Sequence, residues 1–424
     1  AFVMENVSML RSDVHRFYLD ESDAQLIGKY DIPMTETRLL LLEQEYMFIE
    51  APEVIKNLSA IEAALWPEEQ YAALNVIYKA SKNLSKMVGA LEKYKKKIAV
   101  YAEERICGET EDYITEQSSK AFTAVLGYYD NSVQLSELQK AIEPAIMIQR
   151  MLSKAKEIFD NHLVVDKYSC ENGLSAIIRS YAVFDYLKAI LGAEPNNYAI
   201  NASVLCAADY GAPQKRMRFV VMGIKKSLTD TVKLPEGSFR EGNYRTVRDA
   251  ISDLEDISPV TNLEDDIGTV LPDIKEISAL GQRLRDTDIL FNHIITNTRE
   301  TAMERFRSLK QGQNFHSLNE ELKTNTYTDA SRTQNTIYLR LDYDQPSGTV
   351  VNVRKSMWVH PVLDRAVSVR EAARLQTFPD SFIFYGTKDK QYQQVGNAVP
   401  PIMAKAIAKK LAQQLKKIEN GSEQ

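Results

Sequence analysis

The sequence predicts an α/β fold in which a sheet ends in an antiparallel hairpin and a long helical segment is inserted. The apolar run Ala1–Met4 ends at Glu5–Val7, which is typical of a buried parallel strand with polar groups at its carboxyl end. Two apolar segments, 198–206 and 218–224, flank a connection that contains Gly and Pro and predict a hairpin at the sheet edge. Residues 12–173 have a helical character. Because a domain seldom starts in a central strand, we expect further sequence upstream.

The predicted insertion contains two regions with apolar residues at helical spacing. Residues 53–101 are rich in Ala, Leu, Glu and Lys, and residues 135–158 include Pro144, where a helix breaks or kinks. We therefore expect residues 12–173 to form a mostly helical unit beside the sheet, without strands and without side chains that line a cofactor pocket. The run Lys93–Lys97 fits the solvated face of such a helix, with nucleic-acid contact as the alternative.

After the insertion, the pattern returns to that of a mixed domain. Residues 177–191 suit an amphipathic helix that Gly192 and Pro195 end. From residue 228 to 345 the chain is polar and irregular, with weak helices at 247–254 and 300–309, as expected of a loop-rich recognition domain. Residues 402–417 predict a final amphipathic helix.

Composition bounds the class of protein. The chain has 424 residues, of which 44% are hydrophobic and 26% charged, which is the balance of an ordinary soluble protein. No apolar run is long enough for a membrane span, and the start lacks the pattern of a signal peptide. The three scattered cysteines, Cys107, Cys170 and Cys206, suit a reducing cytoplasm and predict neither a disulfide framework nor a metal site.

The charge distribution is uneven. A net charge of -6 argues against a protein that coats nucleic acid over its whole surface. From Ser331 to Gln376, however, seven basic residues stand against four acidic ones, which predicts either a local phosphate-contacting face or a solvated surface. The seven are Arg332, Arg340, Arg354, Lys355, Arg365, Arg370 and Arg374.

The segment Gln214–Arg218 leads into the second hairpin strand. Alternation along a strand puts Gln214, Arg216 and Arg218 on one face and directs Met217 and Phe219 to the core. One side-chain amide and two guanidinium groups on the same face can hold a planar base or a phosphate. Exposed hairpin arginines without a ligand are the alternative.

Four blocks occur in a fixed order: Glu5–Val7, Tyr210–Arg218, Ser368–Asp380 and Gln391–Pro401. Together they resemble the Glu-Asn-Val block, the Gln-x-Arg-x-Arg block and the last two motif blocks of the DNA cytosine-5 methyltransferases. The segment Ser347–Val350 resembles the Thr-Leu dipeptide of the family's target-recognition domain, with Val in place of Leu. The resemblance covers residues 1–7 and about 178–424, and the long insertion departs from the family's pattern.

The resemblance implies a pocket for a cytosine that is flipped out of duplex DNA. Glu5 would act near N3 and the exocyclic amine of the base, where a carboxylic acid draws electron density and favours nucleophilic addition at C6. Arg218 would contact the flipped base, with Arg216 beside it. Thr349 would touch the DNA backbone near that base.

The resemblance also implies a site for S-adenosylmethionine. Asn397, Ala398 and Val399 would lie against this cofactor, with Asn397 making the main contact. Arg370 and Arg374, at i and i+4 on a helix, would either position DNA or lock the domain junction.

Two family blocks are absent from the chain: the Pro-Cys-Gln loop with the nucleophile and the Phe-x-Gly-x-Gly turn of the cofactor site. None of the three cysteines follows a proline. The resemblance therefore implies the later half of a Rossmann-like methyltransferase sheet, with catalytic remainder 1–11 and 174–227, helical insertion 12–173, recognition domain 228–385 and cofactor-side block 386–424.

We therefore expect the chain to be the C-terminal portion of a DNA cytosine-5 methyltransferase. The enzyme would be cytoplasmic, from a bacterium or a phage, and would serve restriction–modification or phage defence. It would act on double-stranded DNA and be inactive without its missing N-terminal portion. Two alternatives stay open: a natural subunit that needs a complementary subunit with the cysteine loop, and a non-catalytic DNA-binding module.

Overall fold

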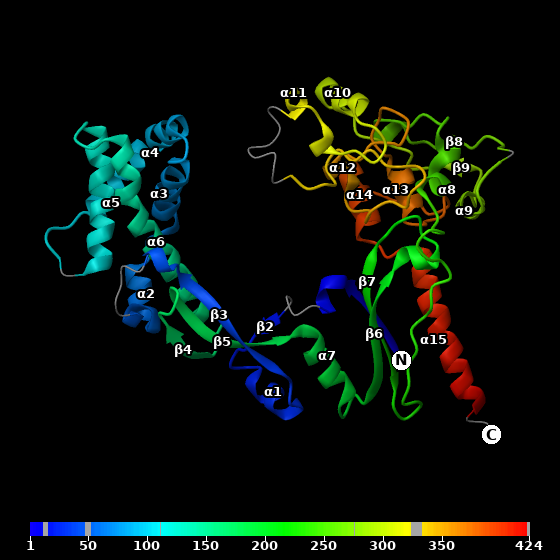
Figure 1. The fold of residues 1–424 in the computed structure, drawn as a ribbon, viewed down its shortest axis with the longest axis horizontal. Coiled ribbons are helices and arrows are strands. Elements are labelled where there is room, and N and C mark those ends of the chain that lie inside the picture. Colours follow the sequence, from blue (N-terminus) through cyan, green and yellow to red (C-terminus); the bar gives the residue numbers. More distant parts are fainter. Residues whose placement is uncertain (12–15, 47–51, 111, 275, 324–332, 422–424) are drawn as a thin grey trace. The chain divides into compact units, whose positions relative to one another are not determined.

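The computed structural model describes residues 1–11, 16–46, 52–110, 112–274, 276–323 and 333–421 (Figure 1). The chain divides into two compact units. Unit 1 comprises Ala1–Ser12 and Leu191–Gln424, and unit 2 comprises Asp13–Ile190. Within the described ranges, no helix is both long and apolar enough to cross a membrane.

Unit 1 is built on a three-stranded antiparallel sheet in the order β1-β7-β6, formed by β1 (Phe2–Val7), β6 (Tyr198–Cys206) and β7 (Met217–Lys225). The predicted hairpin 198–224 is confirmed: β6 and β7 pair from Tyr198–Lys225 to Cys206–Met217. The first strand was predicted to be buried and parallel, and this prediction is wrong for the strand pairs that the structure describes. β1 runs antiparallel to β7, and its Val3 and Val7 are exposed.

A close contact between Phe2 and Gly223 fixes the register of β1 against β7. The two residues are paired across the strands, and a Cβ atom on Gly223 would lie 2.1 Å from the Phe2 ring. The same ring packs edge-on against Tyr198 on β6, with 5.0 Å between the ring centroids. Because a slip of one residue would turn every β1 side chain to the other face, this contact determines which side of the sheet Glu5 occupies.

Helices and loops cover the sheet and complete unit 1. The final helix, α15 (Pro401–Gly421), packs Met403 and Ile407 against Val220 and Met222 of β7, so the predicted helix 402–417 is confirmed. A second core surrounds Trp358 and contains no residue of the sheet. Residues 191–424 belong to one compact unit with no boundary within it. The predicted domain boundaries at 228–385 and 386–424 therefore stay predictions. The other elements include η1 (Ser8–Arg11), α8 (Val247–Ile251), β8 (Thr269–Val270), α9 (Ala279–Leu284), β9 (Ile289–Leu290), α10 (Glu300–Ser308), α11 (Glu320–Lys323), α12 (Val353–Ser356), α13 (Val369–Leu375) and α14 (Lys388–Asn397).

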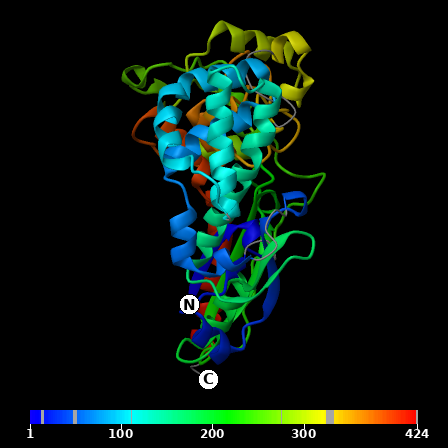
Figure 2. The ribbon, with the colours of Figure 1, turned by 90° about the vertical axis from the view of Figure 1, so that its left-hand side faces the viewer.

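Unit 2 contains a helical bundle whose long helices lie side by side (Figure 2). Polar residues begin two of them: the Asn83 side chain accepts from the Lys86 amide, and the Asp112 side chain accepts from the Thr115 amide. Pro144 lies inside the longest helix, α6, which continues through it rather than breaking. The helices are α1 (Ala24–Tyr30), α2 (Leu58–Ala64), α3 (Glu68–Ala80), α4 (Leu84–Arg105), α5 (Tyr113–Tyr129), α6 (Leu135–Asp160) and α7 (Val183–Gly192), the last of which contains the boundary between the units.

The prediction that residues 12–173 lack strands is wrong. A four-stranded antiparallel sheet is centred on β5 (Leu174–Ala182), which pairs with β2 (Arg16–Tyr18), β3 (Met34–Leu42) and β4 (Val165–Ser169). The insertion consequently extends to Ile190 rather than Gly173. The helix predicted over 177–191 begins only at Val183, because a short apolar run of this kind fits a buried strand as well as a helix.

We predict that a buried amide, Gln149, stabilises the junction between α2 and α6. Its side chain accepts from the Trp66 amide at 2.8 Å and donates to the Ala64 carbonyl at 3.0 Å. Gln149→Leu leaves both backbone groups without a partner, so the free energy of unfolding should fall by about 2–3 kcal/mol. Urea denaturation followed by far-UV circular dichroism measures this loss. The control is Gln139→Leu at an exposed position of the same helix, and equal losses in both variants would contradict the prediction.

Candidate functional site

Glu5 and Arg218 meet on one face of the unit 1 sheet. Glu5 is paired with Val220 and Arg218 with Val7, so alternation along the strands turns both side chains to the same side. The Arg218 Nε atom lies 2.8 Å from the Glu5 Oε1 atom. The two side chains therefore meet despite the long insertion between them, as predicted, and their convergence on one base pocket stays a prediction.

This ion pair is partly buried and keeps capacity for a further partner. The side chains of Arg218 and Glu5 are 14% and 26% exposed, and Arg218 also donates to the Met217 carbonyl at 2.8 Å. Burial lowers the pKa of Arg218, and the Glu5 charge opposes this effect. Although Glu5 Oε1 lies within ion-pair distance of Arg218, no hydrogen bond with good geometry reaches it from the described residues. A carboxylate beside a guanidinium fork can therefore accept and donate along one edge of a planar ligand.

Arg216 is buried and binds protein backbone rather than an open pocket. Its side chain donates from Nη1 to the Val350 carbonyl at 2.7 Å and from Nη2 to the Gly396 carbonyl at 2.8 Å, and the residue is 1% exposed. Burial lowers its pKa to about 10, and the Arg218 charge acts in the same direction. Arg216 was predicted to lie beside Arg218 in the catalytic group, and a direct role in catalysis stays a prediction. Arg216 joins the strand entrance to two other segments.

Gln214 is also buried, so the three predicted side chains do not form one open face. Its amide nitrogen donates to the Leu375 carbonyl and to the Gln376 side chain, both at 2.8 Å, and its amide oxygen accepts from the Val350 amide at 3.2 Å. Met217, predicted to face the core, is 43% exposed, whereas Phe219 is buried as predicted. Of the three side chains Gln214, Arg216 and Arg218, only that of Arg218 is open to a ligand.

Thr349 lies next to the Arg216 segment. Ser347 donates its amide to the Pro213 carbonyl at 2.9 Å, and the Lys215 amide donates to the Ser347 carbonyl at 2.8 Å. The half-exposed Thr349 donates its hydroxyl to the Lys215 carbonyl at 3.4 Å. These bonds hold Thr349 beside the Gln-x-Arg-x-Arg block, and its contact with the DNA backbone stays a prediction.

Asn397 is the last residue of α14, and its side chain is exposed. The preceding Gly396 has no room for a side chain, because a Cβ atom there would lie 2.6 Å from the Val351 carbonyl carbon. Ala398 is half-buried and extended, and half-buried Val399 packs against the core under α15. An exposed amide followed by a partly covered apolar side chain fits a ligand that has both polar and apolar parts.

The comparison with known proteins decides the family. Residues 186–413, more than half of the 424, match the family model of the C-5 cytosine-specific DNA methylases. The chain belongs to this family. Cytosine-5 methylases use S-adenosylmethionine as the methyl donor, and the exposed Asn397 with Ala398 and Val399 fits one side of such a cofactor.

Curated relatives of this methylase chain are type II methyltransferases. M.DdeI of Desulfomicrobium norvegicum is 30% identical over 258 residues, which are 57% of this chain and 61% of that protein. M1.HphI of Haemophilus parahaemolyticus is 33% identical over 211 residues, 50% of this chain and 47% of that protein. M.AquIB of Picosynechococcus is 39% identical over 135 residues, 29% of this chain but 88% of that protein. The chain thus spans less than two thirds of the length of the first two relatives.

Arg370 and Arg374 of this methylase chain are fully buried, and their side chains bind protein groups. Arg370 donates to the carbonyls of Phe291 and Phe382, both at 2.8 Å. Arg374 donates from Nε to Asp380 at 2.9 Å and forms further ion pairs with Asp380 and Asp253. These contacts favour the structural alternative, a lock of the domain junction, over direct DNA contact, and both roles stay predictions.

The basic segment predicted as a phosphate-contacting face is mostly internal. Arg340 is buried with Arg370 and Arg374, and Arg365 pairs with the buried Glu371. Arg354 and Lys355 are exposed, and Arg332 lies outside the described residues. A count of charges along the sequence cannot distinguish inward from outward cations.

A buried ionic group around Glu371 was not predicted. Its carboxylate accepts from Arg365 at 2.6 and 2.8 Å and from the Ser368 amide at 2.8 Å. Burial favours its neutral form, but the Arg365 charge holds the pKa of Glu371 well below its ordinary value. The sequence contains one signal for part of this group: Ser368 and Glu371 have the Ser-x-x-Glu spacing of a capping box, and they form one.

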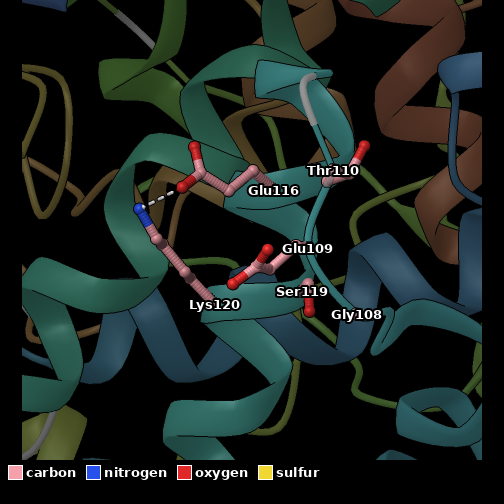
Figure 3. Close-up of a pocket in the computed structure, with 6 residues that line it drawn as sticks. All are labelled: Gly108, Glu109, Thr110, Glu116, Ser119 and Lys120. Carbon is pink, nitrogen blue, oxygen red and sulfur yellow. Dashed lines mark ion pairs between the residues drawn. The ribbon is translucent and has the colours of Figure 1, made fainter.

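A hollow in unit 2 is separate from these residues (Figure 3). It is lined by the loop Gly108–Thr110 and by α5, where Lys120 pairs with Glu116 at 2.8 Å. None of the predicted site residues lines it. Across the residues that the structure describes, no group of three His, Cys, Asp or Glu side chains could hold a metal ion.

Arg374→Met should strongly destabilise unit 1, because it removes the closest counter-charge of the buried Asp380 and Asp253, which leaves only the more distant Arg370 and Arg285 beside them. Loss of one partner from a buried ion pair costs about 3–5 kcal/mol. In a Trp66→Phe background, fluorescence of the buried Trp358 during urea denaturation measures the loss in this unit. The control, Arg354→Met, removes an ion pair with Asp389 whose side chains are 38% and 36% exposed, and it should cost less than about 1 kcal/mol. A loss no larger than in the control would refute the structural lock.

Gly396→Ala should disturb the segment that carries Asn397. The new methyl group would meet the Val351 backbone, so we expect a loss of about 1–3 kcal/mol, as for overpacking in a core. The matched control is Gly348→Ala, where no heavy atom lies within 4 Å of the added Cβ atom. The same fluorescence assay compares the two variants, and an unperturbed Gly396→Ala protein would show that the close approach is not required.

Proposed function

We propose that this chain supplies the later part of a DNA cytosine-5 methyltransferase, which transfers a methyl group from S-adenosylmethionine to C5 of cytosine in duplex DNA. The observation that carries the proposal is the Glu5–Arg218 pair on one face of the sheet. Arg216 ties this strand to the segments that contain Thr349 and Asn397. Three family blocks that are distant in sequence are thereby joined at one place.

In this proposal, Glu5 and Arg218 form the pocket for the flipped base. Protonated Glu5 would donate to N3 of cytosine and accept from its exocyclic amine, which draws electron density from C6 and favours nucleophilic addition there. Arg218, whose position Glu5 fixes, would donate to the exocyclic oxygen of the base. Arg216 touches only protein, so it is a positioning residue. Asn397 would orient the cofactor, which supplies the methyl group when bound.

The nucleophile of this reaction would come from sequence outside the chain. Cys206 ends β6, and burial raises the pKa of its thiol, which disfavours the reactive thiolate. Cys107 and Cys170 belong to unit 2 and, like Cys206, do not follow a proline. The outer edge of β1 has no strand partner among the described residues, and we propose that the remainder of a Rossmann-like sheet joins there.

The missing part would be either continuous with this chain or a complementary subunit. M.AquIB supports the second form, because a match of only 135 residues makes up 88% of a protein that is itself a type II methyltransferase. A part of this family's sequence therefore occurs in a short polypeptide. The type II methyltransferase relatives also support a role in restriction–modification or phage defence.

Incorporation of labelled methyl groups into duplex DNA tests the proposal. The isolated chain should be inactive, and addition of a polypeptide with the Pro-Cys-Gln and Phe-x-Gly-x-Gly blocks should restore activity. In the restored enzyme, Glu5→Gln should lower the rate about 10²–10⁴-fold, as expected for loss of a general acid. The exposed Glu264→Gln is the control and should leave the rate unchanged.

Two outcomes would contradict this proposal. Activity of the isolated chain that a Cys206 substitution abolishes would show that the nucleophile lies within it. DNA binding without methylation, even with the complementary polypeptide, would favour the non-catalytic DNA-binding module.

A further inference from the structure

The positive charge of unit 2 is concentrated in one short segment. Between Lys79 and Lys97 the sequence has seven lysines and one acidic residue, Glu92, a net charge of +6. Residues 13–190 as a whole contain 20 Lys and Arg against 28 Asp and Glu, a net charge of -8. Cations are thus segregated from the acidic remainder of this unit rather than interspersed with it.

Four of these lysines form a stripe along α4, here called the lysine stripe: Lys86, Lys93, Lys96 and Lys97. At 100° per residue, Lys86, Lys93 and Lys97 fall within about 40° of one another, and Lys96 flanks them. All four are exposed, whereas the buried side of the helix holds Leu91 and Ile98. Lys95 points elsewhere, because its ammonium lies 5.1 Å from the centroid of the Tyr129 ring on α5.

Helix stability does not account for the lysine stripe. Lys97 pairs with Glu69 at 3.7 Å, but both side chains are more than half exposed, and no ion pair is seen for the other three among the described residues. Lys86 lies in the first turn of α4, which contains no acidic residue. A cation at that end opposes the helix dipole. A solvated helix face gains more from alternating charges than from one sign.

We propose that the lysine stripe binds the phosphate backbone of double-stranded DNA, as a contact area additional to the catalytic unit. The eleven residue steps from Lys86 to Lys97 rise by about 16 Å. Duplex DNA carries one negative charge per about 1.7 Å of its axis, so several phosphates lie within this length. The choice of DNA among polyanions rests on the proposed function.

The composition of the lysine stripe indicates binding without sequence readout. Ammonium groups on long flexible side chains match phosphates as point charges, whereas base edges are read by Arg, Asn or Gln in fixed geometry. The stripe would therefore hold DNA of any sequence, and recognition of the target site would be left to the loops of unit 1.

The salt dependence of duplex binding by the full chain tests this proposal. Lys86, Lys93, Lys96 and Lys97 are all replaced by Gln, and binding to a mixed-sequence DNA duplex is measured by fluorescence anisotropy over a range of salt. The slope of log K against log salt is negative, and each phosphate contact adds about 0.9 to its magnitude, so this magnitude should fall by about 3 to 4. Far-UV circular dichroism verifies that the variant is folded.

The control variant carries four Lys→Gln changes at exposed positions of residues 13–190 outside α4: Lys29, Lys140, Lys167 and Lys188. Its net charge changes equally, but its slope should equal that of the unaltered chain. An unchanged slope in the stripe variant, an equal fall in the control, or tighter binding of the unaltered chain to RNA or to anionic vesicles than to duplex DNA would each overturn the proposal.

This experiment is independent of the test of the proposed function. Methyl transfer by the restored enzyme measures Glu5, and duplex binding measures the stripe. If the slope is unchanged in the stripe variant but Glu5→Gln lowers the methylation rate, the proposed DNA contact of the lysine stripe is refuted and the proposed function stands. If the slope changes in the stripe variant but Glu5→Gln has no effect on methylation, the stripe is a DNA contact and the chain is a non-catalytic module.

Discussion

The buried guanidinium of Arg216 is the constraint on which the arrangement of the candidate site depends. A charged group out of water is costly unless its donors are satisfied, and two of its nitrogens bind the carbonyls of Val350 and Gly396. The latter bond requires the α14 segment to approach closely, which the absence of a side chain at Gly396 permits. Displacement of either segment would leave a buried cation short of acceptors, so Thr349 and Asn397 are held at fixed positions relative to Arg218.

Arginine and lysine have different places in this chain. Arg216, Arg370 and Arg374 are internal, where a planar fork with several donors can bind separate carbonyls and carboxylates at once. The lysines of α4 are external and mostly without acidic partners among the described residues. The three internal arginines near the family blocks therefore hold the fold together, whereas the lysines of α4 are available to a polyanion. Net charge alone, at -6, conceals this separation.

The sequence predicted features that are local or that a motif marks. The hairpin 198–224 and the helix 402–417 follow from short-range patterns, and the meeting of Glu5 with Arg218 follows from family blocks. The strand β5 was not predicted, because its apolar run gains strand character only from pairing with β2, β3 and β4. Burial of Arg374 was equally hidden, since Asp253, one of its two partners, comes from a distant segment.

The long insertion between Glu5 and Arg218 does not oppose their contact. The entropic cost of closing a loop grows only with the logarithm of its length, by about 0.6 kcal/mol for each doubling. Unit 2 also folds around its own core, so it is not a flexible loop whose full length must be ordered by unit 1. The remaining requirement is the correct register of β1. The Phe2 ring meets it by filling the space above Gly223 and packing against Tyr198, which turns Glu5 to the face of Arg218. A single aromatic–glycine pair can thus secure a site whose two halves lie at opposite ends of a large insertion.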